Sequence, residues 1–235
     1  MTSISERLQA IQTYIRRAEQ QAGREEGSVQ LLAVSKAQPV SAIWEAFQSG
    51  QRLFGENYLQ EALEKMAELA DLPLEWHFIG PVQSNKTRPI AENFAWVHGV
   101  DRLKIAERLS EARPPDLPPL HICLQINVSG EASKGGIAPQ EAGALAQAVS
   151  SLPKLKLRGL MAIPAPTTDV AMQHEQFRML RETLESLNGQ GLSLDTLSMG
   201  MSHDFPVAIA EGASIVRVGT AIFGDRPAKE LRETS

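Results

Sequence analysis

The segment Ser214-Ile215-Val216-Arg217-Val218-Gly219-Thr220 indicates how this chain folds, because a short, largely apolar run ends directly in a turn of small residues. The same arrangement occurs where the run Leu192 to Leu197 is followed by Ser198-Met199-Gly200. Runs such as Leu31-Leu32-Ala33-Val34 are apolar on both faces, as the strands of a parallel sheet covered by helices are. An antiparallel sandwich would alternate polar and apolar residues more strictly. These segments therefore predict buried parallel strands.

Helix and strand signals alternate along all 235 residues. Asn57 and Asp101 are natural N-caps for two of the helices. The predicted strands cover residues 29–35, 52–55, 74–79, 95–100, 120–128, 155–163, 192–197 and 214–218. The predicted helices cover residues 40–49, 57–70, 84–92, 101–112, 139–151, 168–188 and 203–211, with a short one after Gly219. About eight βα units in a chain of this length predict an α/β protein with a (β/α)8 TIM barrel, which typically needs about 250 residues. A doubly wound open sheet is the alternative.

An extra helix precedes the repeating units. Ser3 and Glu6 have the spacing of a capping box, and an apolar stripe follows until Gly23. The proline-rich segment 113–119 is short enough to be a surface loop between a helix and a strand. We therefore expect residues 1–235 to form a single domain.

Composition limits the class of protein and its partners. The chain is 43% hydrophobic and 22% charged, with a net charge of −5, which is typical of a soluble globular protein and lacks the positive field that nucleic acid requires. The only cysteine, Cys123, lies in an apolar run and is expected to be a buried hydrophobe. No signal peptide and no apolar run of about 18 residues is present, so a cytoplasmic protein with no membrane partner is predicted. No two histidines have the spacing of metal ligands.

Two turns and one lysine identify a candidate site. In a (β/α)8 barrel the chemistry lies at the C-terminal ends of the strands, and the loops after strands 7 and 8 often bind phosphate. By this count those loops contain Ser198-Met199-Gly200 and Gly219-Thr220, whose backbone N–H groups can form an anion-binding nest. Lys36 follows the first strand and would open on the same rim. A phosphate site that faces a lysine suits a phosphorylated aldehyde.

The two cations of this site each have a physical requirement. Lys36 follows an apolar strand, so partial desolvation is expected to lower its affinity for a proton, as an amine that attacks an aldehyde needs. Arg217 lies within a buried strand, where a cation must have a partner or face a polar lumen. A salt bridge to Glu211 or Asp225 would satisfy it, and so would a ligand in the barrel mouth.

Several motifs together resemble the pyridoxal phosphate homeostasis proteins. The resemblance covers Val29 to Arg226, nearly the whole chain. The motifs that carry it are Val34-Ser35-Lys36, Phe54-Gly55-Glu56-Asn57-Tyr58, His77-Phe78-Ile79-Gly80 with Gln83-Ser84-Asn85-Lys86, Ser198-Met199-Gly200-Met201-Ser202 with Asp204, and Val216-Arg217-Val218-Gly219 with Phe223-Gly224.

The resemblance implies a barrel like the N-terminal domain of bacterial alanine racemase that binds pyridoxal 5′-phosphate (PLP). On this basis Lys36 matches the lysine that forms the internal Schiff base, and Arg217 matches the arginine that faces the pyridine nitrogen. The positions matched to the phosphate are Ser198, the backbone of Gly200, Gly219 and Thr220. The positions matched to the lining of the cofactor are Asn57, His77 and Met201.

Catalysis is expected to be weak or absent. A cation at Arg217 opposes protonation of the pyridine nitrogen, which makes the ring a poorer electron sink. The related racemase also takes a second acid/base from a C-terminal domain and a partner subunit, whereas only residues 227–235 follow Arg226 here. Tyr14 and Tyr58 are not obvious replacements. His77 or His203 could serve, but a histidine at a strand end is more often a hydrogen-bonded structural residue, so no catalytic residue is assigned.

The resulting hypothesis is a non-catalytic PLP-binding protein of vitamin B6 homeostasis, which through the cofactor affects amino-acid and keto-acid metabolism. PLP-dependent apoenzymes are the expected partners, and a monomer is the default. A PLP-dependent amino-acid racemase or lyase is the main alternative. A class I aldolase-like barrel and a purely regulatory PLP sensor also remain open.

Overall fold

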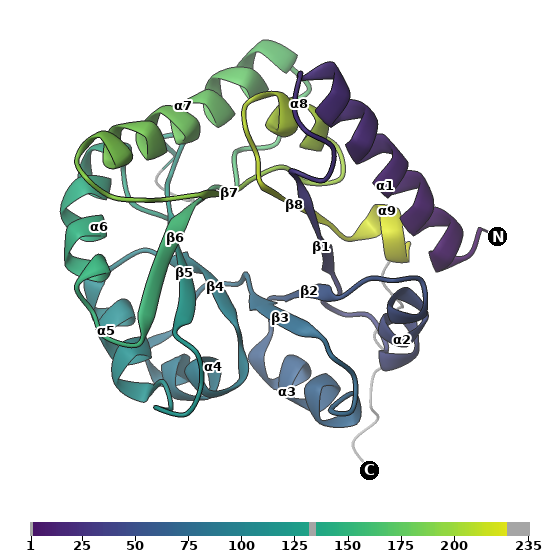
Figure 1. Ribbon diagram of the computed structural model, residues 1–235, viewed down its shortest axis with the longest axis horizontal. Helices are drawn as coiled ribbons and strands as arrows, with labels where there is room; N and C mark the ends of the chain where they lie inside the picture. The colour runs from purple at the N-terminus through teal and green to yellow at the C-terminus, as the bar shows by residue number, and fades with distance from the viewer. Residues whose placement is uncertain (1, 132–134, 225–235) are drawn as a thin grey trace.

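The computed structural model describes residues 2–131 and 135–224, so Asp225, Arg226 and residues 227–235 lie outside the described part. Eight strands pair in parallel, in sequence order, into a closed barrel with helices around it (Figure 1). The predicted (β/α)8 barrel is confirmed, and the doubly wound sheet is excluded. The strands are β1 (Gln30–Val34), β2 (Leu53–Glu56), β3 (Glu75–Phe78), β4 (Trp96–Val100), β5 (Leu120–Gln125), β6 (Leu155–Met161), β7 (Thr196–Ser198) and β8 (Ile215–Val218).

The helices follow the predicted order. After α1 (Ile4–Gln21) come α2 (Val40–Gln48), α3 (Leu59–Glu68), α4 (Thr87–Asn93), α5 (Leu103–Ala112), α6 (Ala142–Ser150), α7 (Val170–Gly189), α8 (Phe205–Ala210) and α9 (Thr220–Phe223), with 3-10 turns η1 (Ser84–Lys86) and η2 (Pro139–Glu141). The capping box of α1 is confirmed, because the Ser3 hydroxyl accepts from the Glu6 N–H and the Glu6 carboxylate accepts from the Ser3 N–H. Helix α1 packs beside α8 and α9, next to the closure between β8 and β1 (Figure 1).

Three local predictions were wrong. Helix α3 begins after Tyr58 and α5 begins after Arg102, so neither Asn57 nor Asp101 caps a helix. Asp101 instead pairs with the Arg102 guanidinium at 3.1 Å. Strand β7 covers only residues 196–198, which places Ser198 in the strand itself rather than in the turn after it. Sequence signals of this kind locate elements better than their ends.

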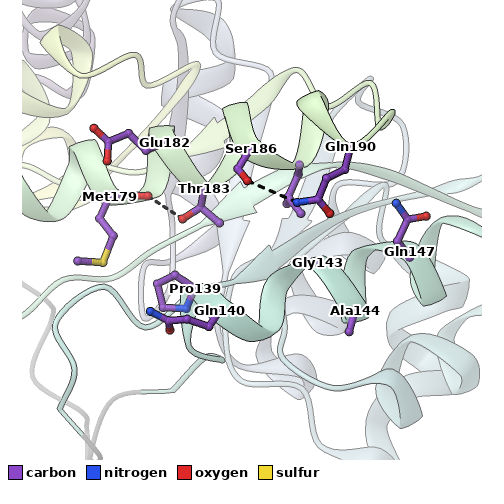
Figure 2. Close-up of a pocket in the computed structure, with 11 residues that line it drawn as sticks. Pro139, Gln140, Gly143, Ala144, Gln147, Met179, Glu182, Thr183, Ser186 and Gln190 are labelled. Atoms are coloured by element: carbon purple, nitrogen blue, oxygen red, sulfur yellow. Dashed lines mark hydrogen bonds between the residues drawn. The ribbon is translucent and has the colours of Figure 1, made fainter.

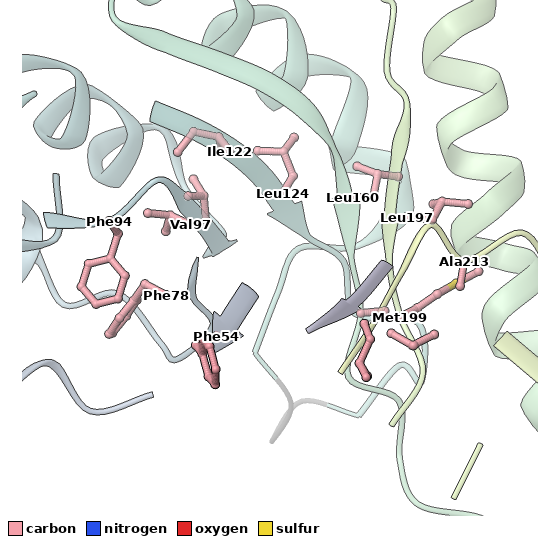
Figure 3. Packing of buried hydrophobic residues seen from close by; sticks show 14 of the residues in the cluster. Phe54, Phe78, Phe94, Val97, Ile122, Leu124, Leu160, Leu197, Met199 and Ala213 are labelled. Atoms are coloured by element: carbon pink, nitrogen blue, oxygen red, sulfur yellow. The ribbon is translucent and has the colours of Figure 1, made fainter. Parts of the chain in front are cut away.

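Alternating strand residues face either the helices or the lumen. The outward side chains, among them Phe54, Phe78, Ile122 and Leu160, pack into the main core between barrel and helices (Figure 3). Apolar side chains on the inner side form two smaller clusters, one of Leu32, Ile79 and Ile215 and the other of Trp96, Cys123 and Met161. Cys123 is fully buried, and this burial raises the pKa of its thiol to about 12, which confirms it as a buried hydrophobe.

Among the helices of residues 2–131 and 135–224, none has both the length and the apolar character needed to cross a membrane. Over the same ranges, the His, Cys, Asp and Glu side chains form no group of three or more that could hold a metal ion.

Candidate functional site

The predicted site residues come together at the C-terminal rim of the barrel. Lys36 lies two residues beyond β1, Asn57 directly follows β2, and Ser198 ends β7. Gly200 and Met201 continue from β7, and Gly219 and Thr220 follow Arg217 at the end of β8. Because β8 pairs with both β1 and β7, the lysine strand lies between β2 and the strand that leads to the Gly219 turn. His77, in the middle of β3, lies deeper and is fully buried.

A sharp turn follows Lys36. The side chain of Lys36 is only partly exposed, and the next residue, Ala37, has a φ of 59°. A left-handed conformation at a residue other than glycine is costly and persists only where the surroundings hold it. The Ala37 N–H donates to Oε1 of Glu61 at 2.6 Å. Helix α3 therefore holds the turn that presents the lysine.

A buried ion cluster stabilises the same turn through Ser35, the residue before Lys36. Lys65 Nζ donates to the Ser35 carbonyl at 2.7 Å and to Glu56 Oε1 at 2.8 Å, and it also pairs with Glu61. The Ser35 hydroxyl donates to the same Glu56 oxygen at 2.7 Å. Burial raises the pKa of Glu56, although Lys65 opposes this effect. The sequence alone predicted no role for Lys65 and placed Glu56 only within a motif. The available signal was a carboxylate at the end of an apolar strand.

One acceptor at the rim has no protein partner. Asn57 Oδ1 is buried, and no residue of the described part donates a hydrogen bond to it. A buried polar atom without a partner costs free energy unless a ligand or water satisfies it. Asn57, predicted as a helix cap and as a cofactor-lining residue, is thus available to a donor in the mouth.

The turn after β7 leaves room only for glycine at its centre. Gly200 has a φ of 90°, and a Cβ there would lie 2.6 Å from the Cβ of Ala208 and 3.0 Å from the Cα of Phe205. The Asp204 carboxylate accepts from the Met201 N–H at 2.6 Å and so fixes the turn at the start of α8. The close approach of helix and turn is what an anion cradle made from backbone requires.

Replacement of Gly200 by alanine is expected to lower the free energy of unfolding by about 2 kcal/mol, because the side chain would be strained and would displace α8. The substitution should also weaken the phosphate binding that the sequence predicts at this rim. Urea unfolding measures the change in stability. The inhibition by inorganic phosphate of binding of the expected ligand, PLP, measures the change in phosphate binding. Gly189→Ala is the matched control, because nothing lies within 4 Å of a Cβ at that position. Unchanged phosphate inhibition in Gly200→Ala would contradict the assignment.

Arg217 faces the lumen with its charge held by neutral acceptors. Only 4% exposed, it donates from Nη1 to the carbonyl and hydroxyl oxygens of Ser198 at 2.6 and 2.7 Å, and from Nη2 to the Ala162 carbonyl at 2.7 Å. Burial lowers its pKa to about 10. Arginine carries five N–H donors, so two remain without an acceptor in the described part of the chain. The predicted partner Glu211 was wrong, and Asp225 lies outside the described residues.

Glu211 fails as a partner because it is already engaged. Its carboxylate pairs with His174, Arg178 and Arg181 on α7, on the outer side of the barrel. These partners lower the pKa of Glu211, although its partial burial acts in the opposite direction and is the largest single influence. The requirement for a polar lumen, the second possibility, is the one that Arg217 meets.

The lumen beneath Arg217 contains a chain of hydrogen bonds. The Ser198 hydroxyl, fully buried, lies 2.8 Å from Nδ1 of His98, and Nε2 of His98 lies 2.9 Å from Nδ1 of His77. Nε2 of His77 lies 2.9 Å from Oε1 of Glu75. Both ring nitrogens of His77 and the Ser198 hydroxyl are therefore occupied within the protein. Sequence analysis missed His98, which the alternation of β4 places inward beside Trp96.

A hollow of the described surface also lies away from the rim. A groove of about 680 Å³ runs between α6 and α7 on the outside of the barrel, lined by residues such as Gly143, Gln147, Met179 and Thr183 (Figure 2). Its hydrogen bonds join residues of α7 to one another and to Gln190, which directly follows the helix. It contains none of the predicted site residues.

Known proteins resemble this chain over nearly its whole length. The alanine racemase N-terminal domain family matches residues 7–227. The pyridoxal phosphate homeostasis protein of Pseudomonas aeruginosa is 64% identical over 226 residues, which cover 96% of this chain and 97% of that protein. The protein of the same name from Escherichia coli K12 is 50% identical over 229 residues, 96% of this chain and 98% of that one. This chain belongs to the pyridoxal phosphate homeostasis protein family.

Solved structures agree with this family. PipY of Synechococcus elongatus, solved with PLP bound, is 41% identical, has a TM-score of 0.83 and covers 94% of this chain and 100% of its own. Alanine racemase of Corynebacterium glutamicum, at 21% identity and a TM-score of 0.66, matches 95% of this chain with 62% of its own, which shows the shared barrel fold.

Proposed function

We propose that this protein binds PLP at the C-terminal rim of its barrel, through a Schiff base on Lys36, and serves vitamin B6 homeostasis rather than turnover of a substrate. The observation that carries the proposal is the convergence on one rim of Lys36, the buried Arg217 and the two glycine turns. The PLP-bound relative PipY and the names of the homologous proteins support the choice of ligand.

The residues present fit this cofactor. Among residues 2–131 and 135–224, two N–H groups of Arg217 have no acceptor, which suits an unprotonated pyridine nitrogen. Over the same ranges Asn57 Oδ1 has no donor, which suits a polar ligand. The turns at Gly200 and Gly219 offer backbone N–H groups to the phosphate. Because the Ser198 hydroxyl is held by Arg217 and His98, we assign the phosphate to these backbone groups and Thr220 rather than to that hydroxyl.

The chemistry of storage needs little from the protein. PLP supplies a reactive aldehyde; the Lys36 amine forms a carbon–nitrogen bond to it and one water leaves, so release requires only that water return. Arg217, which donates and is cationic, disfavours protonation of the pyridine nitrogen and so weakens the ring as an electron sink. The side chains considered as a second acid/base are placed unfavourably for that role. Tyr14 packs edge-on against Phe205 outside the barrel, and Tyr58 is 55% exposed. His77 and His98 are hydrogen-bonded to each other within the lumen.

The test is a comparison of wild type, Lys36→Ala and the control Lys104→Ala, which alters an exposed lysine on α5. Purified wild type loaded with PLP should show a visible absorption band that borohydride abolishes, with a mass increase on the peptide that contains Lys36. Lys36→Ala should lose both features, and Lys104→Ala should keep them. A labelled peptide elsewhere in the chain, or an unaltered band in Lys36→Ala, would refute the Schiff base.

Catalysis and assembly are tested on the same samples. The fold shared with alanine racemase makes racemisation the first activity to assay. We expect PLP-loaded protein to racemise alanine no faster than free PLP, and a rate that depends on Lys36 would establish a racemase or lyase instead. We also propose a cytoplasmic monomer that hands PLP to PLP-dependent apoenzymes and thereby affects amino-acid and keto-acid metabolism. Light scattering and the rate of apoenzyme reactivation measure these two points.

A further inference from the structure

The hydrogen-bond chain below Arg217 can run in only one direction. Its far end is Glu75, the first residue of β3, so it lies at the N-terminal end of the barrel with 46% of its side chain exposed. An ionised carboxylate only accepts hydrogen bonds, and the bond from His77 lowers the pKa of Glu75, which keeps it ionised. Nε2 of His77 therefore carries the proton, and in the neutral ring Nδ1 must accept.

The remaining hydrogen bonds of the chain have the same direction. Nδ1 of His77 accepts, so Nε2 of His98 carries a proton and donates to it. Nδ1 of a neutral His98 then accepts from the Ser198 hydroxyl. The Ser198 oxygen, which has given its only proton, accepts from Arg217, a group that can only donate. Every donor in the chain thus points from the barrel mouth towards Glu75.

The surroundings keep both histidines neutral. Burial lowers the pKa of His77 and lowers that of His98 further, where the nearby His77 and Arg217 add to the effect. The Trp96 ring stacks on His77 at a centroid distance of 5.3 Å with the planes 5° apart. On the neighbouring strands, Arg158 donates to Nδ1 of His121 at 2.7 Å, so the proton of a neutral His121 lies on Nε2. Burial, and after it the charge of Arg158, lower the pKa of this third ring as well.

We propose that Glu75, His77, His98 and Ser198 are positioning residues that form a one-way hydrogen-bond chain through the barrel, by which a carboxylate at the far end holds Arg217 ready to donate to a ligand in the mouth. Glu75 sets the direction of the chain. Arg217 alone does not, because the Ser198 oxygen could accept hydrogen bonds from His98 and Arg217 at the same time. In that reversed arrangement the Ser198 hydroxyl proton would need another acceptor, and turning the hydroxyl towards one would disturb the bond from Arg217 to the Ser198 oxygen. The effect on a ligand rests on the proposed function, whereas the direction of the chain does not.

The direction is measured on ligand-free protein. Long-range ¹H–¹⁵N NMR spectra near neutral pH should show His77 and His98 as neutral rings protonated at Nε2. Nδ1 protonation of either ring, or a charged ring, would overturn the proposal even if PLP binds as proposed. This arm needs neither cofactor nor variant.

The coupling to the mouth is measured with Glu75→Gln and its matched control Glu68→Gln, an exposed glutamate on α3. An uncharged amide both donates and accepts, so Glu75→Gln should populate the reversed tautomers of His77 and His98. It should also weaken PLP binding about fivefold, the lower end of usual coupling between sites. Glu68→Gln should change neither. Wild-type tautomers and wild-type affinity in Glu75→Gln would refute the coupling, whereas failure of the proposed function would appear as wild type that does not bind PLP at all.

Discussion

Lys65→Met should lower the free energy of unfolding by about 3 kcal/mol at pH 7. The substitution leaves Glu56, which is fully buried, without the ammonium group 2.8 Å away. Breaking a buried pair from one side typically costs 3–5 kcal/mol. The cost is limited here because Glu56 can take up a proton instead, and holding a carboxyl neutral at pH 7 against an ordinary pKa of 4.5 costs about 3 kcal/mol.

This limit gives the prediction a pH signature. In Lys65→Met the protonated Glu56 of the folded state faces an ionised Glu56 in the unfolded chain, so the folded state binds more protons. As the pH falls from 7 to 5, the loss of stability relative to wild type should therefore shrink, by at most about 1.4 kcal/mol per pH unit, because the raised pKa of Glu56 gives wild type part of the same slope. Lys104→Met, on an exposed face of α5, should change stability by less than about 0.5 kcal/mol.

Removing both charges tests the cause. Lys65→Met combined with Glu56→Leu should recover much of the lost stability, because an apolar pair replaces the ion pair without leaving a charge behind. Denaturant unfolding of the single and double variants provides the cycle. A single variant that loses less than about 1 kcal/mol, or a double variant that loses more than the single one, would show that the cluster is not held by this pair.

The same variants bear on the proposed site. Lys65 holds the Ser35 carbonyl and pairs with Glu61, which in turn holds Ala37. The turn that carries Lys36 is thus tied to α3 on both sides. We expect the double variant to regain stability more fully than it regains PLP binding, because an apolar pair restores no hydrogen bond to this turn.

The barrel itself could be predicted because its signals are local. A run such as Ile215-Val216-Arg217-Val218 indicates a buried strand, and the Gly219-Thr220 turn indicates where it ends. Neither indication depends on a residue distant in the sequence. The predicted site residues at strand ends follow from the same signals, since parallel strands bring their C-terminal ends to one rim. Lys36, Gly200 and Arg217 all lie there.

The polar interior could not be predicted, because it depends on closure of the barrel. His77 and His98 are 21 positions apart, and His98 and Ser198 are 100 positions apart. Their contact requires the register of four intervening strand pairs. From the sequence, His77 was therefore expected to line the cofactor and Ser198 to bind the phosphate. Arg217 was expected either to pair with Glu211 or Asp225 or to face a ligand in the barrel mouth, and its bonds to Ser198 and Ala162 were not foreseen. The helix starts near Asn57 and Asp101 failed for a smaller reason, since a capping residue type does not show which of two adjacent positions is used.

The two buried histidines should make the folded protein sensitive to acid. Each has a pKa below the ordinary 6.5 in the folded state, while the unfolded chain takes up protons at the ordinary value. Their contribution to stability is therefore complete above pH 6.5 and is lost as the pH falls from 6.5 towards the lower pKa of each ring in the folded state, by at most about 1.4 kcal/mol per pH unit for each ring. Because the pKa of His98 is lowered further than that of His77, His98 should account for the larger share of the loss.

The groups that face the pair determine how this loss is measured. Glu75 favours a proton on His77, whereas Arg217 opposes one on His98. Burial and, after it, Arg158 lower the pKa of the neighbouring His121. Glu56, whose pKa is raised, contributes in the opposite direction over part of the same range, so the histidine effect is read as a difference between variants.

His98→Asn keeps a donor and an acceptor in the lumen without a titrating ring. Its stability should fall less steeply than that of wild type between pH 6.5 and pH 5, by about 1.4 kcal/mol per pH unit. The exposed His203→Asn should follow the wild-type curve. Denaturant unfolding at half-unit pH intervals gives these slopes, and proton uptake during unfolding at pH 6 gives an independent count. Parallel curves for His98→Asn and wild type would mean that the His98 ring already carries a charge in the folded protein, which would break the chain from Arg217 to Glu75 at its centre.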